Sequence, residues 1–208
     1  MYKRQPRYSF AGSDQLAAQI QQGVPADVFA AASPKYPDQL YAQGLVEKPV
    51  VFARNRLVLI VPNSNPANIH SVYDLRKPGV KLMIGNSTVP VGSYTRTVLK
   101  NMGLSSVLSN VVSQEVDVRS VLTKVVLGEA DAGFVYVTDA LTVPGQVKTI
   151  TIPAWAQPKQ AYEIAVVKST GDRVDAVAFI KKVMSKAGQA LLRKAGFLPP
   201  PPGTTYSG

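Results

Sequence analysis

The sequence predicts an α/β fold in which strands alternate with amphipathic helices and the sheets are largely parallel. Short apolar runs of strand length alternate with segments of helical periodicity along the chain. The clearest run, 56–62, is continuous and β-branched, as expected of a strand covered on both faces. A chain of 208 residues allows one large or two small domains, and it contains no flexible linker. Two α/β lobes would therefore be joined by strands that cross between them near 54–61 and 152–162.

The composition excludes several classes of protein. No apolar run approaches the ~20 residues of a membrane span. The chain has no cysteine and one histidine, His70, so disulfides, thiolate metal sites and multi-histidine sites are excluded. The net charge of +10 comes from basic residues scattered along the chain, without a nucleic-acid motif. We expect no nucleic-acid partner, and this charge would help to attract a small anion.

The first predicted helix follows a serine that has the features of an N-cap. Ser13 stands at the N-cap position, Leu16 and Ile20 repeat at helical spacing, and Gly23 ends the helix. The free amides at such a helix start attract anions. Alternatively, Ser13 only caps its own helix.

The remaining elements follow in order. Strands are expected at 26–31, 56–62, 81–85, 132–136, 147–152 and 162–167. Further helices are expected at 33–43, 93–101, 117–127 and 172–186, with a last piece to residue 194. Asp117 is the predicted N-cap of the helix that starts at Val118.

Three helix starts and one tyrosine form a candidate anion site. The starts are at Ser13, at Val91 and at Val118, and Tyr136 ends a short predicted strand. In open α/β sheets such ends lie at the carboxyl edges of strands, where ligands bind. If they converge, a hydroxyl, several amides and a phenol could hold a dianion without any lysine or arginine.

The chain resembles a known family in an ordered set of segments. The matching segments are 9–20, 23–29, 89–94, 115–119 and 134–140, and the correspondence extends from about residue 8 to 198. Together they resemble the molybdate-binding proteins of ABC transporters, which have the type II periplasmic-binding-protein fold. The resemblance implies two α/β lobes: 6–56 with 160–198, and 57–159. The proline run 199–202 predicts that the tail 199–208 is disordered.

The resemblance also implies the ligand contacts. Ser13 would donate its hydroxyl and amide to molybdate or tungstate, Val91 and Val118 their amides, and Tyr136 its hydroxyl. No protein atom would bind the metal directly, and no cofactor is implied. Gly92 and Ser93 would shape the loop, and Arg119 would belong to a structural pair rather than to the anion.

The function implied by the resemblance is that of an extracytoplasmic solute receptor, lipid-anchored in some cases. Such a receptor is a monomer that closes around its oxyanion and docks on a membrane permease. It is not an enzyme.

The N-terminal residues depart from the family pattern. Residues 1–5 match a translated sequencing adapter, so they are excluded from the fold. We expect the signal segment and the first strand and helix of lobe 1 to be missing, together with a serine ligand that the family has there. Ser33, in the similar run 30–33, occupies a later position in the family order and is interpreted as a helix cap.

Three alternatives remain open. The chain could be a receptor for sulfate, phosphate or a small carboxylate, because these anions also present oxygens to the same donors. It could be the effector-sensing domain of a transcription regulator, although no helix-turn-helix segment is found. An enzyme using Ser13, Asp117 or Tyr136 lacks a Gly-x-Ser-x-Gly elbow and a well-placed base.

Overall fold

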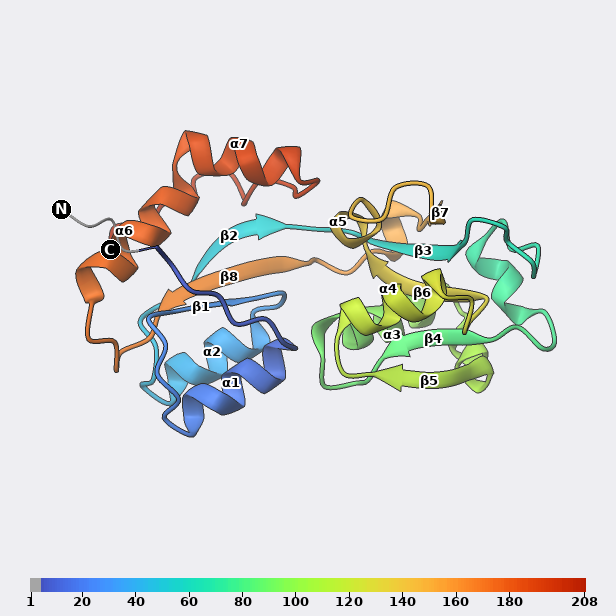
Figure 1. The fold of residues 1–208 in the computed structure, drawn as a ribbon, viewed down its shortest axis with the longest axis horizontal. Coiled ribbons are helices and arrows are strands. Elements are labelled where there is room, and N and C mark those ends of the chain that lie inside the picture. Colours follow the sequence, from blue (N-terminus) through green and yellow to red (C-terminus); the bar gives the residue numbers. More distant parts are fainter. Residues whose placement is uncertain (1–4) are drawn as a thin grey trace.

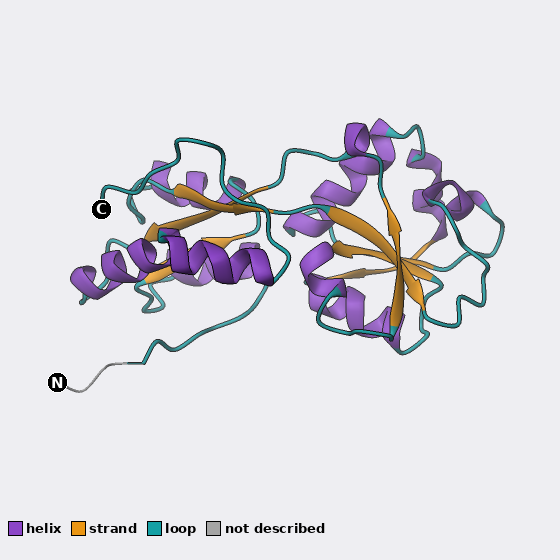
Figure 2. Ribbon diagram, turned by 90° about the horizontal axis from the view of Figure 1, so that it is seen from above, coloured by secondary structure: helices purple, strands orange, loops and turns teal. Residues whose placement is uncertain are grey.

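The computed structural model describes residues 5–208, and it consists of two lobes, each built on its own sheet (Figure 1). Figure 2 shows the two sheets as separate bodies joined by extended segments. The predicted adapter segment 1–5 lies outside the described residues except for Gln5. Within the described part of the chain, no helix is both long and apolar enough to cross a membrane.

The smaller lobe has a three-stranded sheet in the order β1-β8-β2. Its strands are β1 (Val28–Ala31), β2 (Val50–Arg54) and β8 (Ala161–Val166). Its helices are α1 (Ser13–Gln21), α2 (Lys35–Ala42), α6 (Arg173–Met184) and α7 (Lys186–Lys194). Helices α1 and α2 lie below this sheet in Figure 1, and α6 and α7 lie above it. Phe29 and Leu40 are buried with Ile20 in the core between β1, α1 and α2.

The larger lobe has a five-stranded sheet in the order β5-β4-β6-β3-β7. Its strands are β3 (Leu57–Pro62), β4 (Leu82–Gly85), β5 (Val111–Glu115), β6 (Ala132–Tyr136) and β7 (Val147–Thr151). Its α-helices are α3 (Pro90–Asn101), α4 (Val118–Val126) and α5 (Val137–Ala140), and its 3-10 turns are η1 (Val72–Arg76), η2 (Ser105–Asn110) and η3 (Ala154–Ala156). Leu57 and Leu59 share a core cluster with α3, whereas Val58 and Ile60 share one with α4. Helices α3 and α4 therefore cover opposite faces of this sheet.

The prediction of largely parallel sheets is wrong. Strand β4 pairs parallel with β5 and β6, but β3 pairs antiparallel with β6 and β7. In the smaller sheet, β8 pairs antiparallel with both β1 and β2. The reason is the way the chain passes between the lobes: β2 leads into β3 through Asn55 and Arg56 alone. Strand β3 therefore enters the larger sheet at the edge where β6 ends, with Leu57 opposite Tyr136, and it runs against its neighbour.

Side-chain amides tie the two crossing segments together. The Leu57 N–H donates to Gln157 Oε1 at 3.1 Å, and Gln157 Nε2 donates to the Leu57 carbonyl at 2.7 Å. The buried Asn55 donates from Nδ2 to Tyr162 Oη at 3.2 Å and to Thr138 Oγ1 at 2.9 Å.

We propose the lobe boundaries 6–56 with 160–198 and 57–159, because these residues lie where the chain leaves one sheet and enters the other.

The C-terminal residues 199–208 contain no helix or strand. The side chain of Tyr206 nevertheless packs against the core cluster that includes Ala176 and Ile180 of α6. The predicted disorder of this tail stays a prediction.

Several predicted helix starts differ from those in the structure. Gly12, not Ser13, is the N-cap of α1, since the Gly12 N–H donates to Gln15 Oε1 and Ser13 is already helical. Ser33 is not a cap, because α2 starts at Lys35 with Pro34 at the N-cap. Pro37 fits within the first turn of α2, since first-turn residues need no intrahelical acceptor. Helix α3 starts at Pro90 rather than near residue 93, and Asp117 is the N-cap of α4 as predicted.

Strands β2 and β5 are absent from the sequence prediction. Val50–Arg54 precedes a stronger apolar run, and β5 has alternating half-buried and exposed residues. Neither strand therefore has the continuous apolar pattern of β3.

Gly92 permits the turn from β4 into α3. A Cβ atom at this position would lie 1.8 Å from the carbonyl oxygen of Asn86 and 2.3 Å from that of Gly85. We predict that Gly92→Ala lowers the free energy of unfolding by about 2–3 kcal/mol, because the backbone must shift to admit the methyl group. Urea denaturation would measure the loss, with the exposed Ser93→Ala as control. A Gly92→Ala variant as stable as Ser93→Ala would contradict this role.

Candidate functional site

Three parallel strands place three chain segments at one edge of the larger sheet. Strands β5, β4 and β6 are neighbours and run in the same direction, so their carboxyl ends share an edge. Strand β4 leads into α3, β5 leads into α4, and β6 ends at Tyr136. Val91, Val118 and Tyr136 therefore lie at the edge where α/β sheets bind ligands.

Helix α3 presents buried amides at its start. Val89 is the N-cap, Pro90 is the first helical residue, and Val91 follows with 2% of its surface exposed. A proline at the first position costs the helix no hydrogen bond, because the first-turn amides have no intrahelical acceptor. The Val91 amide lies in this unsatisfied first turn.

Helix α4 starts at the neighbouring position with one of its amides already satisfied. Asp117 Oδ1 accepts a hydrogen bond of 2.7 Å from the Ser120 N–H. The amide of Val118, the first helical residue, lies ahead of that bond. At this helix start the Ser120 amide is therefore capped by Asp117, whereas the Val118 amide is available to a ligand.

Tyr136 supplies a buried hydroxyl. Its side chain is 3% exposed, its ring packs edge-on against Tyr162 with centroids 5.6 Å apart, and its hydroxyl has no hydrogen-bond partner among the described residues. Burial raises the pKa of this phenol well above its ordinary value, so it stays protonated. A buried phenol without a partner is costly unless a ligand accepts its proton.

Ser13 comes from the smaller lobe. Its side chain is buried, and its Oγ accepts a hydrogen bond of 3.2 Å from the Ala32 N–H. The bond orients the hydroxyl toward the end of β1, and the hydroxyl proton has no acceptor in the described chain. Ser13 can therefore donate its hydroxyl proton to a ligand.

The start of α1 lies against the starts of α3 and α4. A Cβ atom built on Gly12 would lie 2.8 Å from the Val116 carbonyl oxygen and 3.2 Å from a Val89 methyl group. Gly12 and Val89 are the N-caps of α1 and α3, and Val116 directly precedes the N-cap of α4. The structure thus brings the three predicted helix starts together across the two lobes.

The arginines near the site have structural contacts. The Arg119 guanidinium lies 4.5 Å from the centroid of the Phe10 ring, so its partner is an aromatic ring. Arg96 donates to the carbonyl oxygens of Gly85 and Gly92 and to Gln114 Oε1. The Phe10 contact was missed from the sequence, because an exposed aromatic side chain in a loop carries no periodic signal.

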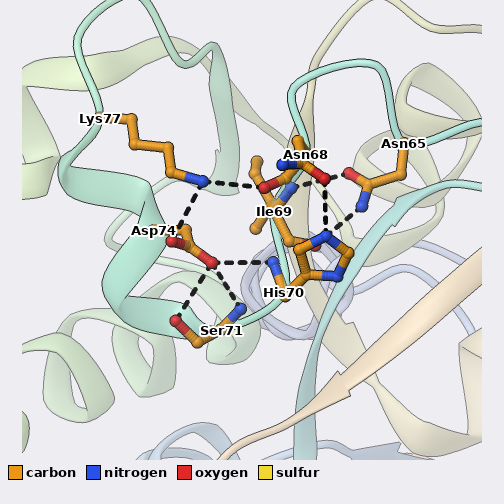
Figure 3. A network of polar contacts seen from close by, with 7 residues as sticks. All are labelled: Asn65, Asn68, Ile69, His70, Ser71, Asp74 and Lys77. Atoms are coloured by element: carbon orange, nitrogen blue, oxygen red, sulfur yellow. Dashed lines mark hydrogen bonds and ion pairs between the residues drawn. The ribbon is translucent and has the colours of Figure 1, made fainter.

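His70 belongs to a separate polar network in the larger lobe (Figure 3). Its backbone N–H donates to Asp74 Oδ2 at 2.8 Å, and its ring contacts Asn68 Oδ1 at 2.7 Å. The His70 N–H contributes most to lowering the Asp74 pKa to about 2. Across residues 5–208, no group of three or more His, Asp or Glu side chains could hold a metal ion.

The chain matches a known protein family. Residues 3–198 match the family described as bacterial extracellular solute-binding protein. The chain belongs to this family. Among its relatives, the molybdate-binding protein ModA of Mycobacterium tuberculosis (strain ATCC 25618 / H37Rv) is 40% identical over 194 residues, covering 93% of this chain and 73% of that protein.

Solved structures of solute-binding proteins have the same fold. The substrate binding domain of a putative molybdenum ABC transporter from Clostridium difficile is 28% identical, with a TM-score of 0.68, and the match covers 92% of this chain and 84% of that one. The periplasmic molybdate-binding protein of Azotobacter vinelandii is 24% identical, with a TM-score of 0.81 and coverage of 92% and 86%. The two-lobed α/β fold of this solute-binding protein is therefore confirmed.

Asp139, three residues after Tyr136, makes the stability of this solute-binding protein dependent on pH. Burial raises its pKa from 3.8 to about 6, although the Tyr136 N–H, which donates to Oδ2 at 3.0 Å, opposes the shift. The folded state therefore keeps a proton that the unfolded state releases. As the pH rises from about 4 to above 6, the free energy of unfolding therefore falls by roughly 3 kcal/mol.

We predict that Asp139→Asn removes this component of the pH dependence. Denaturation of both proteins between pH 4 and 7 would measure it. An unchanged difference in stability between parent and variant across that range would contradict the raised pKa.

Proposed function

We propose that this chain is an extracytoplasmic receptor that binds a tetrahedral oxyanion, molybdate or tungstate, for uptake by an ABC transporter. The observation that carries the proposal is the meeting of three helix starts beside the buried, unpartnered hydroxyl of Tyr136. The relative from Mycobacterium tuberculosis and the structure from Azotobacter vinelandii, both called molybdate-binding proteins, support the identity of the anion.

In this proposal the anion is held by uncharged donors from both lobes. Ser13 donates its hydroxyl and amide from the smaller lobe, whereas Val91 and Val118 donate backbone amides from the larger lobe. Tyr136 donates its phenol. Partial positive charge at the helix starts stabilises the dianion, and this effect is strong where water is excluded.

Neutral donors also suit reversible binding. A buried lysine or arginine would remain as an uncompensated charge after the anion left, which is unfavourable. Amides and hydroxyls have a much smaller desolvation cost when the lobes open. Molybdate, tungstate and sulfate have the same charge and four oxygens, so the size of the closed cavity is the basis for selecting among them.

The receptor acts by changing the population of its closed form. Donors on both lobes bind the anion together only when the lobes meet, so binding shifts the equilibrium toward closure. We propose that a membrane permease recognises the closed form, that the protein acts as a monomer outside the cytoplasm, and that it performs no catalysis. The family description, bacterial extracellular solute-binding protein, supports the location outside the cytoplasm and a role in solute binding.

The first test is thermal unfolding with anions, followed through the fluorescence of Trp155, which is 63% exposed. We expect molybdate and tungstate to raise the melting temperature and sulfate and phosphate to leave it unchanged. A ligand at ~100 times its dissociation constant stabilises the folded state by ~2.7 kcal/mol. A shift with sulfate or phosphate alone would reassign the anion, and no shift with any of the four would contradict the oxyanion proposal.

The second test assigns the donors. We predict that Ser13→Ala and Tyr136→Phe each weaken molybdate binding by about 10- to 100-fold, the effect of losing one hydrogen bond to a charged group. Val91→Ala should bind almost normally, because its contact is through the backbone. Isothermal titration would measure each affinity, with Ser33→Ala as the matched control for Ser13→Ala. Loss of binding in the Ser33→Ala variant, with Ser13→Ala unaffected, would move the serine contact to residue 33.

A further inference from the structure

Thr88 connects the two lobes at the rim of the site. It lies on the loop between β4 and α3 in the larger lobe. Its Oγ1 donates to Asp14 Oδ2 on α1 at 2.7 Å, and its carbonyl accepts a hydrogen bond of 2.5 Å from Tyr36 Oη on α2. Both partners belong to the smaller lobe, so one residue makes polar contacts with two of its helices.

These two hydrogen bonds lie away from the crossing strands. The other hydrogen bonds that join the lobes in residues 5–208 involve the crossing segments, as do those of Asn55. Thr88 also lines a pocket of about 280 Å³ between the lobes, together with Ser33 and Lys35 of the smaller lobe. Separation of the two lobes would break both hydrogen bonds of Thr88, so these bonds oppose it.

The contacts of Thr88 are directly linked to the proposed anion donors. Asp14 follows Ser13 in the chain, and Val91 lies three residues after Thr88. When Thr88 bonds to Asp14, the starts of α1 and α3 are held side by side. Formation of this contact thus assembles donors that come from different lobes.

The hydroxyl of Thr88 has a second acceptor on its own loop, within reach in the same structure. Asn86 Oδ1 lies 2.6 Å from Thr88 Oγ1 and also accepts the Thr88 N–H at 2.8 Å. One hydroxyl proton serves one of these acceptors at a time. When Asp14 moves away with the smaller lobe, Asn86 remains as an acceptor, so no donor on Thr88 is left unsatisfied and the contact is readily reversible.

We propose that Thr88 is an interlobe latch that populates the closed form before the ligand arrives and so determines how tightly the site holds its anion. The effect on anion affinity rests on the function proposed above. The apparent dissociation constant of a binding-competent state rises in proportion as that state becomes less populated. Thr88 is a positioning residue, since it acts through the relative placement of Ser13 and Val91.

Four variants test the latch. Thr88→Val removes the hydroxyl and keeps the branched shape, whereas Tyr36→Phe removes the second hydrogen bond from the other side. Thr88→Ser keeps a hydroxyl and should restore the latch. Ser87→Ala is the matched control, since Ser87 is the exposed neighbour on the same loop.

We expect Thr88→Val and Tyr36→Phe each to raise the dissociation constant for molybdate about tenfold, mainly through faster dissociation. Thr88→Ser and Ser87→Ala should match the parent. Stopped-flow mixing and isothermal titration would measure these changes. Parent-like affinity and dissociation in both Thr88→Val and Tyr36→Phe would overturn the latch.

The lobe distance separates failure of the latch from failure of the proposed function. The chain has no cysteine, so Gln22→Cys and Thr123→Cys place two fluorophores, one on each lobe, without background labelling. We expect Thr88→Val to shift the ligand-free distribution of energy transfer toward longer distances. An unchanged distribution would overturn the latch even if molybdate binds. If the parent bound no anion, the proposed function would fail, and this distribution alone would decide the latch.

Discussion

The structure depends on one electrostatic constraint: a site for a buried dianion needs donors on all sides, and a single helix start offers donors on only one. The parallel order of β5, β4 and β6 meets part of this need by bringing Val91, Val118 and Tyr136 to one sheet edge. In the proposed site, Ser13 on the other lobe supplies the remainder. Because donors from separate bodies must meet, the two-lobed fold and the proposed binding chemistry are inseparable.

The parts of the structure that were predictable from sequence are those that local physics determines. The continuous apolar run of β3 and the side-chain cap of Asp117 depend on residues close in the chain, and both are present. The strand directions were not predictable, because they depend on where the chain passes between lobes. Gly12 rather than Ser13 is the N-cap of α1, and the Ser13 hydroxyl instead accepts a hydrogen bond from the Ala32 N–H, 19 residues away.

In the candidate site, too, the features set by nearby residues were predictable and those set by distant residues were not. The helix starts carry local signals, and the structure brings them together. The contact of Thr88 with Asp14 joins residues 74 positions apart, and neither has a motif that indicates its partner. The net charge of +10 was also a poor guide to the site, since Arg96 and Arg119 bind carbonyl groups and an aromatic ring. The contacts of Thr88 with Asp14 and of Arg119 with Phe10 arise only when segments of the two lobes meet.

Gly92 has a consequence for how this chain can vary over evolutionary time. In a site that binds through main-chain amides, Val91 and Val118 could be exchanged for other small apolar residues while the donors stayed in place. Gly92, which contributes no atom to the proposed ligand contacts, has no such freedom, because a methyl group there meets the Asn86 carbonyl oxygen at 1.8 Å. Substitution in related lineages should therefore be more restricted at this turn than at the neighbouring residues proposed to contact the anion.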